Sequence, residues 1–432
     1  MVAVEPGRME LKEFEVGPPQ KDQILLKLGV TSVCASDPKI LWGRTSLVRF
    51  PVIMGHELVG QVAEIGEEAA ARYGLKPGDR ITVEPSITCG HCEWCRTEHY
   101  YHKCQRLKIY GLSMTADQPP FLFGGYAEYM YIVPGSILHK VAPGVPYLVA
   151  SLSSVVGNGV RWVKTLGQMT FGQSLAISGV GSQGLATLIA ARECGVGPIA
   201  ALGLSRDEAR FELAREFGAD FTVNIEQENP LKVVPEQLGG FPDVVVETSG
   251  VPSAIQTALE LVKPTGRVVT IGLSGGKETA IKFDSLVDKG VTILADAGQA
   301  GNMADAVRII NSRKYAIEKI SNFISHARKP QAFKPGDEWH PFGAKRRPFP
   351  AYSGMVEGHA RYARGLKPRS LDRGVGSFIT WRNCPELWMK QLTLRRVLLR
   401  VPWYSIDAGS QPDRVQSPQG SIRHAPFNLL SK

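Results

Sequence analysis

Short apolar runs separated by glycine and proline dominate the first 150 residues of the chain. Four of them, Ile24–Leu28, Leu58–Ile65, Arg80–Val83 and Tyr126–Val133, are continuous or alternate between apolar and polar positions. Turn sequences such as Lys76-Pro77-Gly78-Asp79 lie between them. Because short runs bounded by turn residues are typical of β-strands, we expect a compact β-rich domain here.

The pattern changes at about residue 152, where apolar runs begin to alternate with longer helical stretches. The predicted strands are Leu175–Ile177, Ile199–Leu202, Phe221–Val223, Asp243–Val246, Arg267–Ile271 and Val291–Leu294. The predicted helices are Leu185–Cys194, Asp207–Phe217 and Ser253–Val262. This alternation is typical of a parallel sheet with helices on both faces. The predicted fold class is therefore α/β, a β-rich domain followed by a doubly wound parallel sheet.

Three glycines follow the first strand of this second part. Gly179, Gly181 and Gly184 have the spacing G-x-G-x-x-G and stand between that strand and the next helix. In a dinucleotide-binding turn the first glycine permits the tight turn, the second lets a pyrophosphate approach the backbone, and the third lets helix and strand pack closely. The alternative is a glycine-rich turn with a structural role only. We predict that these glycines bind NAD or NADP.

The end of the next strand bears on which dinucleotide binds. NAD-binding proteins of this kind carry an acidic residue about 20 positions after the glycines, which binds the ribose 2′-hydroxyl. Here the corresponding position is Gly203, and Ser205 and Arg206 follow it. A missing carboxylate beside a serine and an arginine favours a 2′-phosphate, hence NADP. Alternatively, Ser205 and Glu208 form a capping box for the following helix.

Four cysteines lie close together in the first part of the chain. Cys89, Cys92, Cys95 and Cys104 have the spacing C-x2-C-x2-C-x8-C. Four thiolates on one short loop can close a tetrahedral zinc site with no open position, which is a structural site. The alternative, four unpaired surface thiols, would leave reactive groups exposed. The nearby residues His91, His99 and His102 are interpreted as solvated, because the cysteines already complete the metal's coordination.

A second set of candidate ligands lies in the same part of the chain. Cys34 stands in VTSVCASDPK with Ser36 and Asp37, and His56 stands beside Glu57 in PVIMGHELVG. Cysteine and histidine are ligand types that suit zinc. The alternative is a buried structural cysteine and a histidine satisfied by neighbouring groups. We predict that Cys34 and His56 bind a metal.

Composition and charge limit the other classes of function. Of 432 residues, 43% are hydrophobic and 21% charged, as in a globular protein long enough for two domains. The net charge of +9 belongs to residues 325–432, which hold 19 Lys and Arg against 7 Asp and Glu, so the remainder is slightly acidic. With no run of about 18 apolar residues and no apolar leader, we expect a cytoplasmic protein that binds neither nucleic acid nor a membrane.

Together these residues resemble the zinc-containing medium-chain alcohol and polyol dehydrogenases. The resemblance covers about residues 3–323 and depends on C-x-S-D at Cys34, G-H-E ending at Glu57, the four-cysteine loop and the glycine turn. It implies a zinc-dependent transfer of hydride between an alcohol, polyol or ketone and NAD(P). By position, Cys34 and His56 resemble catalytic zinc ligands, Glu57 the adjacent acidic residue that can approach the metal, and Ser36 the hydroxyl that relays the alcohol proton.

The resemblance also divides the chain. It implies a GroES-like catalytic domain over residues 1–153, a Rossmann domain over 154–298 and the start of a segment that returns to the catalytic domain over 299–324. We also expect a homo-oligomer, either a dimer or a tetramer. Residues 325–432 are rich in proline, arginine and aromatic residues without clear periodicity, and we predict a basic extension that is disordered or loosely packed.

Three positions depart from the family's pattern. The third catalytic ligand, usually Cys, Asp or Glu, is replaced by Ser153-Ser154, which leaves Glu57 or a water to complete the metal's coordination. Lys39 stands where a relay histidine is common, and the last cysteine gap is x8 rather than x7. These departures keep open a reductase of the same fold without catalytic zinc, acting on an activated carbonyl or alkene. The basic C-terminal tail keeps open a second alternative, a non-catalytic protein that uses this tail to bind nucleic acid or an anionic surface.

Overall fold

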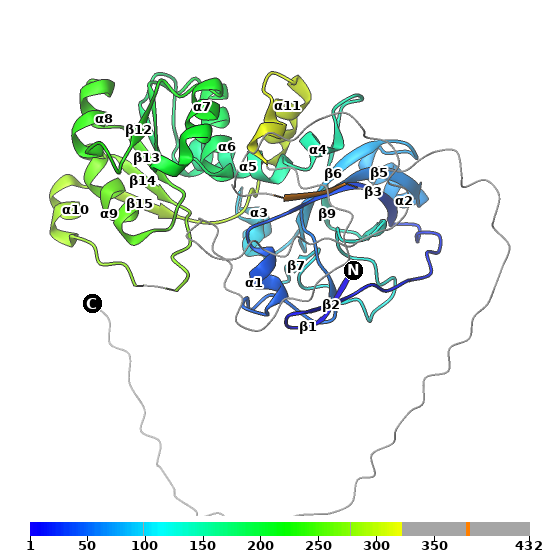
Figure 1. The fold of residues 1–432 in the computed structure, drawn as a ribbon. Helices are drawn as coiled ribbons and strands as arrows, with labels where there is room; N and C mark the ends of the chain where they lie inside the picture. The colour runs from blue at the N-terminus through cyan, green and yellow to red at the C-terminus, as the bar shows by residue number, and fades with distance from the viewer. Residues whose placement is uncertain (98, 277, 322–376, 381–432) are drawn as a thin grey trace, which may run out of the picture. The chain divides into compact units, whose positions relative to one another are not determined.

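The structure, a computed structural model, describes residues 1–97, 99–276, 278–321 and 377–380 (Figure 1). Among these residues, no helix is both long and apolar enough to cross a membrane. The β-rich part comes first and the parallel sheet second, as the hydrophobic pattern predicts. Apart from residues 377–380, the predicted basic extension over residues 325–432 lies outside the described residues.

The β-rich part is built on one large antiparallel sheet. Its main path runs β16-β3-β5-β6-β7, with β8 paired to β3 and β9 to β6, and a three-stranded sheet β2-β1-β4 lies in the same part of the chain. The strands of the large sheet are β3 (Ile24–Val33), β5 (Leu58–Ile65), β6 (Arg80–Ile87), β7 (Lys108–Ile109), β8 (Tyr129–Ile132), β9 (Ser136–Lys140) and β16 (Ser377–Thr380). Those of the small sheet are β1 (Val2–Glu5), β2 (Arg8–Glu10) and β4 (Val52–Ile53).

Short helices connect these strands. They are α1 (Asp37–Leu41), α2 (Glu67–Tyr73), α3 (Glu93–Arg96), the 3₁₀ turn η1 (Tyr101–Lys103) and α4 (Tyr147–Ala150). One buried apolar cluster, formed by the inward side chains of β1, β3, β5, β6 and β8, is the core of this part. It contains residues such as Ile24, Leu26 and Leu58, so the alternating runs of the sequence mark the core face correctly.

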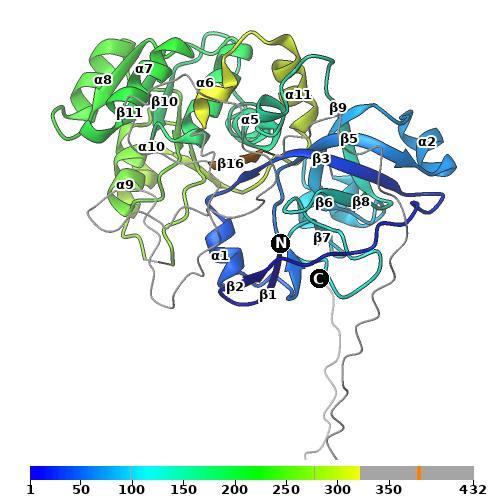
Figure 2. The ribbon, with the colours of Figure 1, turned by 45° about the vertical axis from the view of Figure 1, so that its right-hand side comes forward.

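The second part is a six-stranded parallel sheet in the order β12-β11-β10-β13-β14-β15, of which Figure 2 labels β10 and β11. Its strands are β10 (Leu175–Ser178), β11 (Ile199–Gly203), β12 (Phe221–Asn224), β13 (Val244–Glu247), β14 (Arg267–Thr270) and β15 (Thr292–Ala295). The strand order reverses between β10 and β13, and in such sheets ligands bind at the carboxyl ends beside this point. Gly179 follows β10 directly, so the structure places the glycine turn there.

Side chains of each central strand alternate between two buried clusters. On β10, Leu175 and Ile177 belong to one cluster and Ala176 to the other. Helices cover both faces, as predicted: α5 (Ser153–Val160), α6 (Ser182–Glu193), α7 (Glu208–Glu216) and α11 (Met303–Ser312) contribute to the first cluster, and α8 (Pro230–Leu238), α9 (Pro252–Leu261) and α10 (Phe283–Lys289) to the second. The sheet is therefore doubly wound.

Several elements differ from the sequence expectation. The segment η2 (Arg161–Leu166), which continues α5 as a π-helix, the helix α8 and the short η3 (Ser205–Asp207) and η4 (Ile317–Ile320) were not predicted. The hydrophobic pattern of the sequence does not predict helix α8, because Pro235 lies inside it and Val234 is its only buried residue. Within the predicted irregular extension, β16 forms a strand that pairs antiparallel with β3, from Ser377 beside Val33 to Thr380 beside Val30.

Candidate active site

Cys34, Ser36, His56 and Glu57 come from two neighbouring strands of the large sheet. Cys34 directly follows β3, and His56 and Glu57 directly precede β5, which pairs antiparallel with β3. The pairing brings the end of one strand to the start of the other, so one possible ligand atom from each of Cys34, His56 and Glu57 lies within 4.8 Å of the others. Ser36 Oγ lies 3.4 Å from His56 Nε2 and therefore faces the same cluster.

The electrostatics of this cluster favour a cation. Burial raises the pKa of Glu57 to about 7, and its side chain belongs to a residue that is only 6% exposed. Burial alone would lower the pKa of His56, but the Asp37 carboxylate outweighs it and raises that pKa well above 6.5. A half-buried thiol, an imidazole and two buried carboxyl groups together form a donor set that suits zinc.

Asp37 is a site residue that the sequence analysis left without a role. Its carboxyl group is buried, with Oδ1 3.4 Å from His56 Nδ1. Its Oδ2 accepts hydrogen bonds from the Cys34 backbone N–H at 2.6 Å and from the Tyr126 hydroxyl at 3.1 Å. A carboxylate behind a metal-binding histidine fixes the ring's orientation. The available sequence signal was its position directly after Ser36 in C-x-S-D.

The two serines at the expected third-ligand position begin helix α5. Ser153 is fully buried, and its hydroxyl donates a hydrogen bond to the Ala150 carbonyl at 2.6 Å. This hydroxyl therefore serves the turn that leads into the helix. Lys39, at the position of the common relay histidine, lies on α1 with its side chain exposed.

The four-cysteine loop has the geometry of a tetrahedral thiolate site. The Sγ–Sγ distances are 3.5 Å for Cys92–Cys95, 3.8 Å for Cys89–Cys95 and 3.9 Å for Cys92–Cys104. Zinc–sulfur bonds of about 2.3 Å in a tetrahedron separate the sulfurs by about 3.8 Å, which is the spacing found. Backbone N–H groups lower the pKa of Cys92 to about 6, so a thiolate is available at neutral pH. These four residues fit a closed, structural zinc site.

The glycine turn has the shape that a dinucleotide requires. Gly179 has a φ of +100°, which only glycine adopts readily. A Cβ on Gly184 would lie 1.9 Å from the Gly179 carbonyl oxygen, whereas a Cβ on Gly181 would meet nothing within 4 Å. Helix α6 begins at Ser182, so its N-terminal N–H groups face the open space over Gly181. Gly179 therefore makes the tight turn, Gly181 leaves room for a ligand to approach, and Gly184 allows the helix and the strand to pack closely.

The end of β11 differs in detail from the sequence interpretation. The capping carboxylate of the next helix is Asp207, whose Oδ2 accepts a hydrogen bond from the Leu204 N–H at 3.0 Å. The proposed capping box between Ser205 and Glu208 is therefore wrong, since Ser205 instead contacts Asn224 through its hydroxyl and Glu226 through its backbone N–H. Arg206 lies in the same turn, η3.

Comparisons with known proteins agree with this geometry. The chain matches the family models "Alcohol dehydrogenase GroES-like domain" over residues 20–143 and "Zinc-binding dehydrogenase" over residues 183–312. It is 34% identical over 305 residues to a protein of Mycobacterium tuberculosis named a probable alcohol dehydrogenase, covering 69% of this chain and 82% of that protein. This chain belongs to the zinc-containing medium-chain dehydrogenases.

Two further relatives support the assignment. The dehydrogenase is 36% identical over 309 residues to an L-threonine 3-dehydrogenase of Pyrococcus horikoshii, covering 69% of this chain and 83% of that protein. The alcohol dehydrogenase TADH from Thermus sp. ATN1 superposes with a TM-score of 0.63 at 29% identity, covering 74% of this chain and 91% of that chain. The chain is therefore a zinc-type, NAD(P)-dependent oxidoreductase with GroES-like and Rossmann domains.

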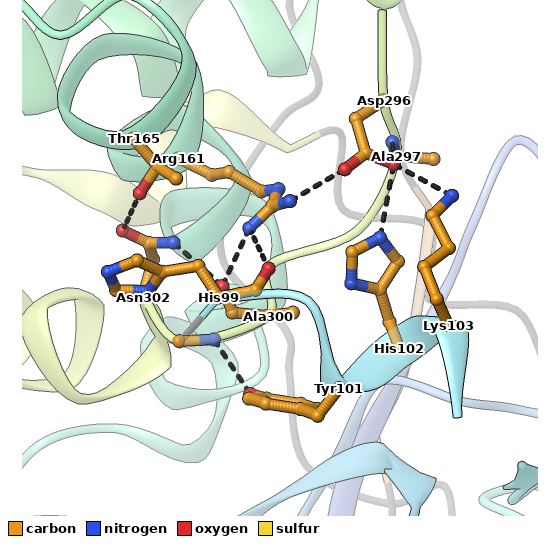
Figure 3. Close-up of polar contacts among 11 residues, drawn as sticks. His99, Tyr101, His102, Lys103, Arg161, Thr165, Asp296, Ala297, Ala300 and Asn302 are labelled. Carbon is orange, nitrogen blue, oxygen red and sulfur yellow. Dashed lines mark hydrogen bonds and ion pairs between the residues drawn. The ribbon is translucent and has the colours of Figure 1, made fainter. Parts of the chain in front are cut away.

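A buried ion-pair network joins the four-cysteine loop of the dehydrogenase to the segment that follows β15 (Figure 3). The Arg161 guanidinium donates to the His99 carbonyl at 2.7 Å, to the Ala300 carbonyl at 2.8 Å and to Asp296 Oδ2 at 2.6 Å. His102 Nε2 and Lys103 Nζ each lie 3.0 Å from Asp296 Oδ1. The interpretation of His102 as a solvated loop residue is wrong, because its side chain is 13% exposed and faces this carboxylate.

Tyr101 makes a second connection in the same place. Its hydroxyl donates to Glu84 on β6 and accepts a hydrogen bond from the Gly301 N–H at 2.8 Å. Thr165 on η2 donates to Asn302 Oδ1 at 3.0 Å. The segment 296–302 leads from the last strand of the parallel sheet, β15, to α11. The four-cysteine loop contacts this segment on one side, and the helix formed by α5 and η2 contacts it on the other.

Proposed function

We propose that this dehydrogenase transfers a hydride between a secondary alcohol or polyol and NAD(P), with Cys34, His56 and Glu57 holding a catalytic zinc. The observation that carries the proposal is the convergence of these three side chains within 4.8 Å, beside the Ser36 hydroxyl. Zinc, when bound there, supplies Lewis-acid polarisation of the substrate oxygen.

The chain's own residues prepare the substrate for this reaction. Ser36 Oγ is placed to accept the alcohol proton and pass it outward, since it lies beside His56 and near the start of α1. Asp37 orients the His56 ring, and Glu57 completes the donor set that lacks the family's third ligand. Gly179, Gly181 and Gly184 hold the dinucleotide's pyrophosphate, while Gly203, Ser205 and Arg206 lie where its adenosine ribose is expected.

A substrate screen tests the proposal. We expect the purified enzyme to reduce NAD+ or NADP+ with at least one secondary alcohol or polyol, and Cys34→Ser to abolish turnover. The folded Cys34→Ser protein should still bind the dinucleotide, because the glycine turn is formed by residues between β10 and α6 and does not include Cys34. Turnover that survives in Cys34→Ser would contradict a catalytic role for this cluster.

The alternative is a reductase of the same fold that works without catalytic zinc. The serines at positions 153 and 154 favour it, because neither is one of the family's usual third ligands. Zinc content separates the two functions: about two zinc ions per chain support the zinc-dependent dehydrogenase, and about one supports the reductase. The convergence of Cys34, His56 and Glu57 favours the dehydrogenase.

We further propose that the enzyme is a homo-oligomer that associates through the β15 edge of the parallel sheet. Within the described residues, β15 pairs with β14 alone, and its side chains are mostly exposed, unlike those of a covered parallel strand. Large apolar side chains are also exposed in the adjoining stretch: Leu273, Ile281, Phe283, Val287 and Ile293. An open apolar edge is complementary to a second copy of itself about a twofold axis.

A further inference from the structure

The carboxyl end of β11 has no room for the acidic residue that NAD-binding sheets usually place there. Gly203 is buried, and a Cβ on it would lie 2.9 Å from the Phe211 ring and 3.0 Å from Val180 Cγ2. Any longer side chain at this position would displace the packing between β11, α7 and the glycine turn. An acid that recognises the ribose must therefore come from another element.

Such an acid comes from the neighbouring strand. Asn224, the last residue of β12, pairs with Gly203, and Glu226 follows two residues later. Glu226 Oε2 accepts a hydrogen bond from the Ser205 backbone N–H at 2.8 Å. The Asn224 side chain donates to Ser205 Oγ at 3.0 Å and so holds the turn against the end of β12. A carboxylate is thereby tethered at the start of η3, directly after β11.

Two residues of this turn, Ser205 and Arg206, act on Glu226. The contacts with Ser205 and the nearby Arg206 guanidinium lower the pKa of Glu226, so the carboxylate is ionised at neutral pH. Arg206 is the residue whose charge favoured a 2′-phosphate in the sequence interpretation. In the structure the Glu226 carboxylate, which follows β12, lies near enough to Arg206 to interact with its charge.

We infer that Glu226 is the residue that makes this dehydrogenase prefer NAD(H) over NADP(H). The inference rests on the proposed function and concerns the same dinucleotide site. A ribose 2′-hydroxyl can donate a hydrogen bond to the tethered carboxylate. A 2′-phosphate would carry about two negative charges toward that carboxylate, and it would find the Ser205 N–H already taken. This preference is opposite to the NADP preference inferred from Gly203, Ser205 and Arg206 in the sequence.

The chain offers a matched control for Glu226. Glu228 lies two residues further on, carries the same charge and is exposed. Its Oε2 accepts a hydrogen bond from the Asn224 backbone N–H at 3.2 Å. Removing the charge of Glu228 therefore changes the net charge of this region by the same amount but leaves the contact between Glu226 and Ser205 in place.

Equilibrium binding of NADH and NADPH, followed by nicotinamide fluorescence without substrate, tests the inference. We expect the wild-type full chain to bind NADH at least about tenfold more tightly than NADPH, a difference of about 1.4 kcal/mol. Glu226→Gln should narrow this ratio at least about fivefold, mainly by tighter NADPH binding, whereas Glu228→Gln should leave it within about twofold. Melting temperatures confirm that each variant is folded.

Three results would overturn the inference. Wild-type preference for NADPH would refute it directly, as would a ratio that is unchanged in a folded Glu226→Gln protein. An equal change in Glu226→Gln and Glu228→Gln would assign the effect to general charge rather than to the tethered carboxylate. Failure of the wild type to bind either dinucleotide would instead refute the proposed dehydrogenase function, and the inference with it.

Discussion

The buried Glu57 carboxyl group lies with a thiol and an imidazole in a site that lacks the family's usual third ligand. If Glu57 supplies that ligand, Glu57→Gln should release the catalytic zinc while the four-cysteine site keeps its metal, because an amide donates less charge to zinc than a carboxylate does. We expect zinc after mild chelation to fall from about two ions per chain to about one.

The control for this prediction is Glu64→Gln, an exposed carboxylate on the same strand, β5. It should retain the wild-type zinc content. Ser154→Cys should retain the catalytic zinc more firmly than the wild type, since it adds a thiolate at the expected third position. Equal retention by all four proteins would show that the third ligand lies elsewhere.

Substitutions at two glycines of the glycine turn should separate an effect on folding from an effect on dinucleotide binding. Gly184→Ala should destabilise the protein by about 3 kcal/mol or more, because its Cβ would overlap the Gly179 carbonyl oxygen. Gly181→Ala should leave the melting temperature nearly unchanged, since its Cβ meets only open space. Its dinucleotide affinity should nevertheless fall about tenfold or more, as the added methyl group blocks the pyrophosphate's approach.

Thermal unfolding and nicotinamide fluorescence measure these two effects independently. The prediction requires that stability and affinity respond to different glycines. A Gly181→Ala protein that binds both dinucleotides as tightly as the wild type would indicate that the pyrophosphate lies elsewhere along the turn.

At the scale of elements, the network around Asp296 fixes the segment after β15 against the zinc loop. The Asp296 side chain is 5% exposed and the Arg161 side chain fully buried. Asp296→Asn should cost about 3 kcal/mol at neutral pH, because it leaves the Arg161 charge buried without its anion. Asp305→Asn, which breaks pairs with the exposed Lys164 and Arg308, should cost at most about 1 kcal/mol.

The pH dependence of this difference follows from the sign of the pKa shift. Burial would raise the pKa of Asp296, but His102, Arg161 and Lys103 outweigh it and hold that pKa well below its usual range. Because the pKa of Asp296 is lower in the folded than in the unfolded protein, its carboxylate stabilises the fold at pH values above its unfolded pKa of about 4. This stabilisation is lost as the pH falls below that value toward the folded pKa. Denaturant unfolding should therefore show the largest difference between wild type and Asp296→Asn at pH 7 and a shrinking one below pH 4. A difference independent of pH would contradict the ion-pair explanation.

The elements also show how far sequence reasoning reaches. Strands β10 to β15 lie within a residue or two of their predicted bounds, because buried parallel strands are continuous apolar runs. The paired ends of β3 and β5 likewise bring the predicted Cys34 and His56 together. The sequence did not predict the site or network roles of Asp37, Glu226 and Asp296. Each of these roles depends on a side-chain contact with a residue that is distant in the chain or that follows a neighbouring strand. Local periodicity carries no signal for such contacts.

At the scale of the whole molecule, the proposed function divides one reaction between the two halves. The antiparallel sheet brings the predicted zinc ligands together at the end of β3 and the start of β5, and the predicted dinucleotide-binding turn follows β10 of the parallel sheet. The network of Figure 3 connects the halves, because His99, His102 and Lys103 belong to the zinc loop and Asp296 follows the last parallel strand. We therefore expect loss of the structural zinc to weaken contacts at the segment 296–302 as well as within its own loop.

The β15 edge gives the last prediction, which concerns assembly. Ile293 on β15 is 43% exposed, and the side of β15 away from β14 has no strand partner among the residues that the structure describes, so its backbone groups can pair with a second copy of the chain. Ile293→Lys should dissociate the oligomer, because a lysine on an edge strand opposes both apolar contact and strand pairing. Sedimentation velocity should show the wild type as a dimer or tetramer and the variant as a smaller species.

Phe171→Lys is the matched control for this substitution. Phe171 is 88% exposed, yet it lies in the loop before β10 rather than at the β15 edge. Its replacement removes an exposed apolar side chain and adds the same charge, and the oligomer should persist. A wild type that sediments as a monomer would refute the proposed oligomer. An Ile293→Lys protein that remains fully associated while Phe171→Lys dissociates would place the interface on another surface. A variant that dissociates and keeps the wild-type affinity for NADH would show that the edge serves assembly alone, since the dinucleotide turn lies at the centre of the sheet.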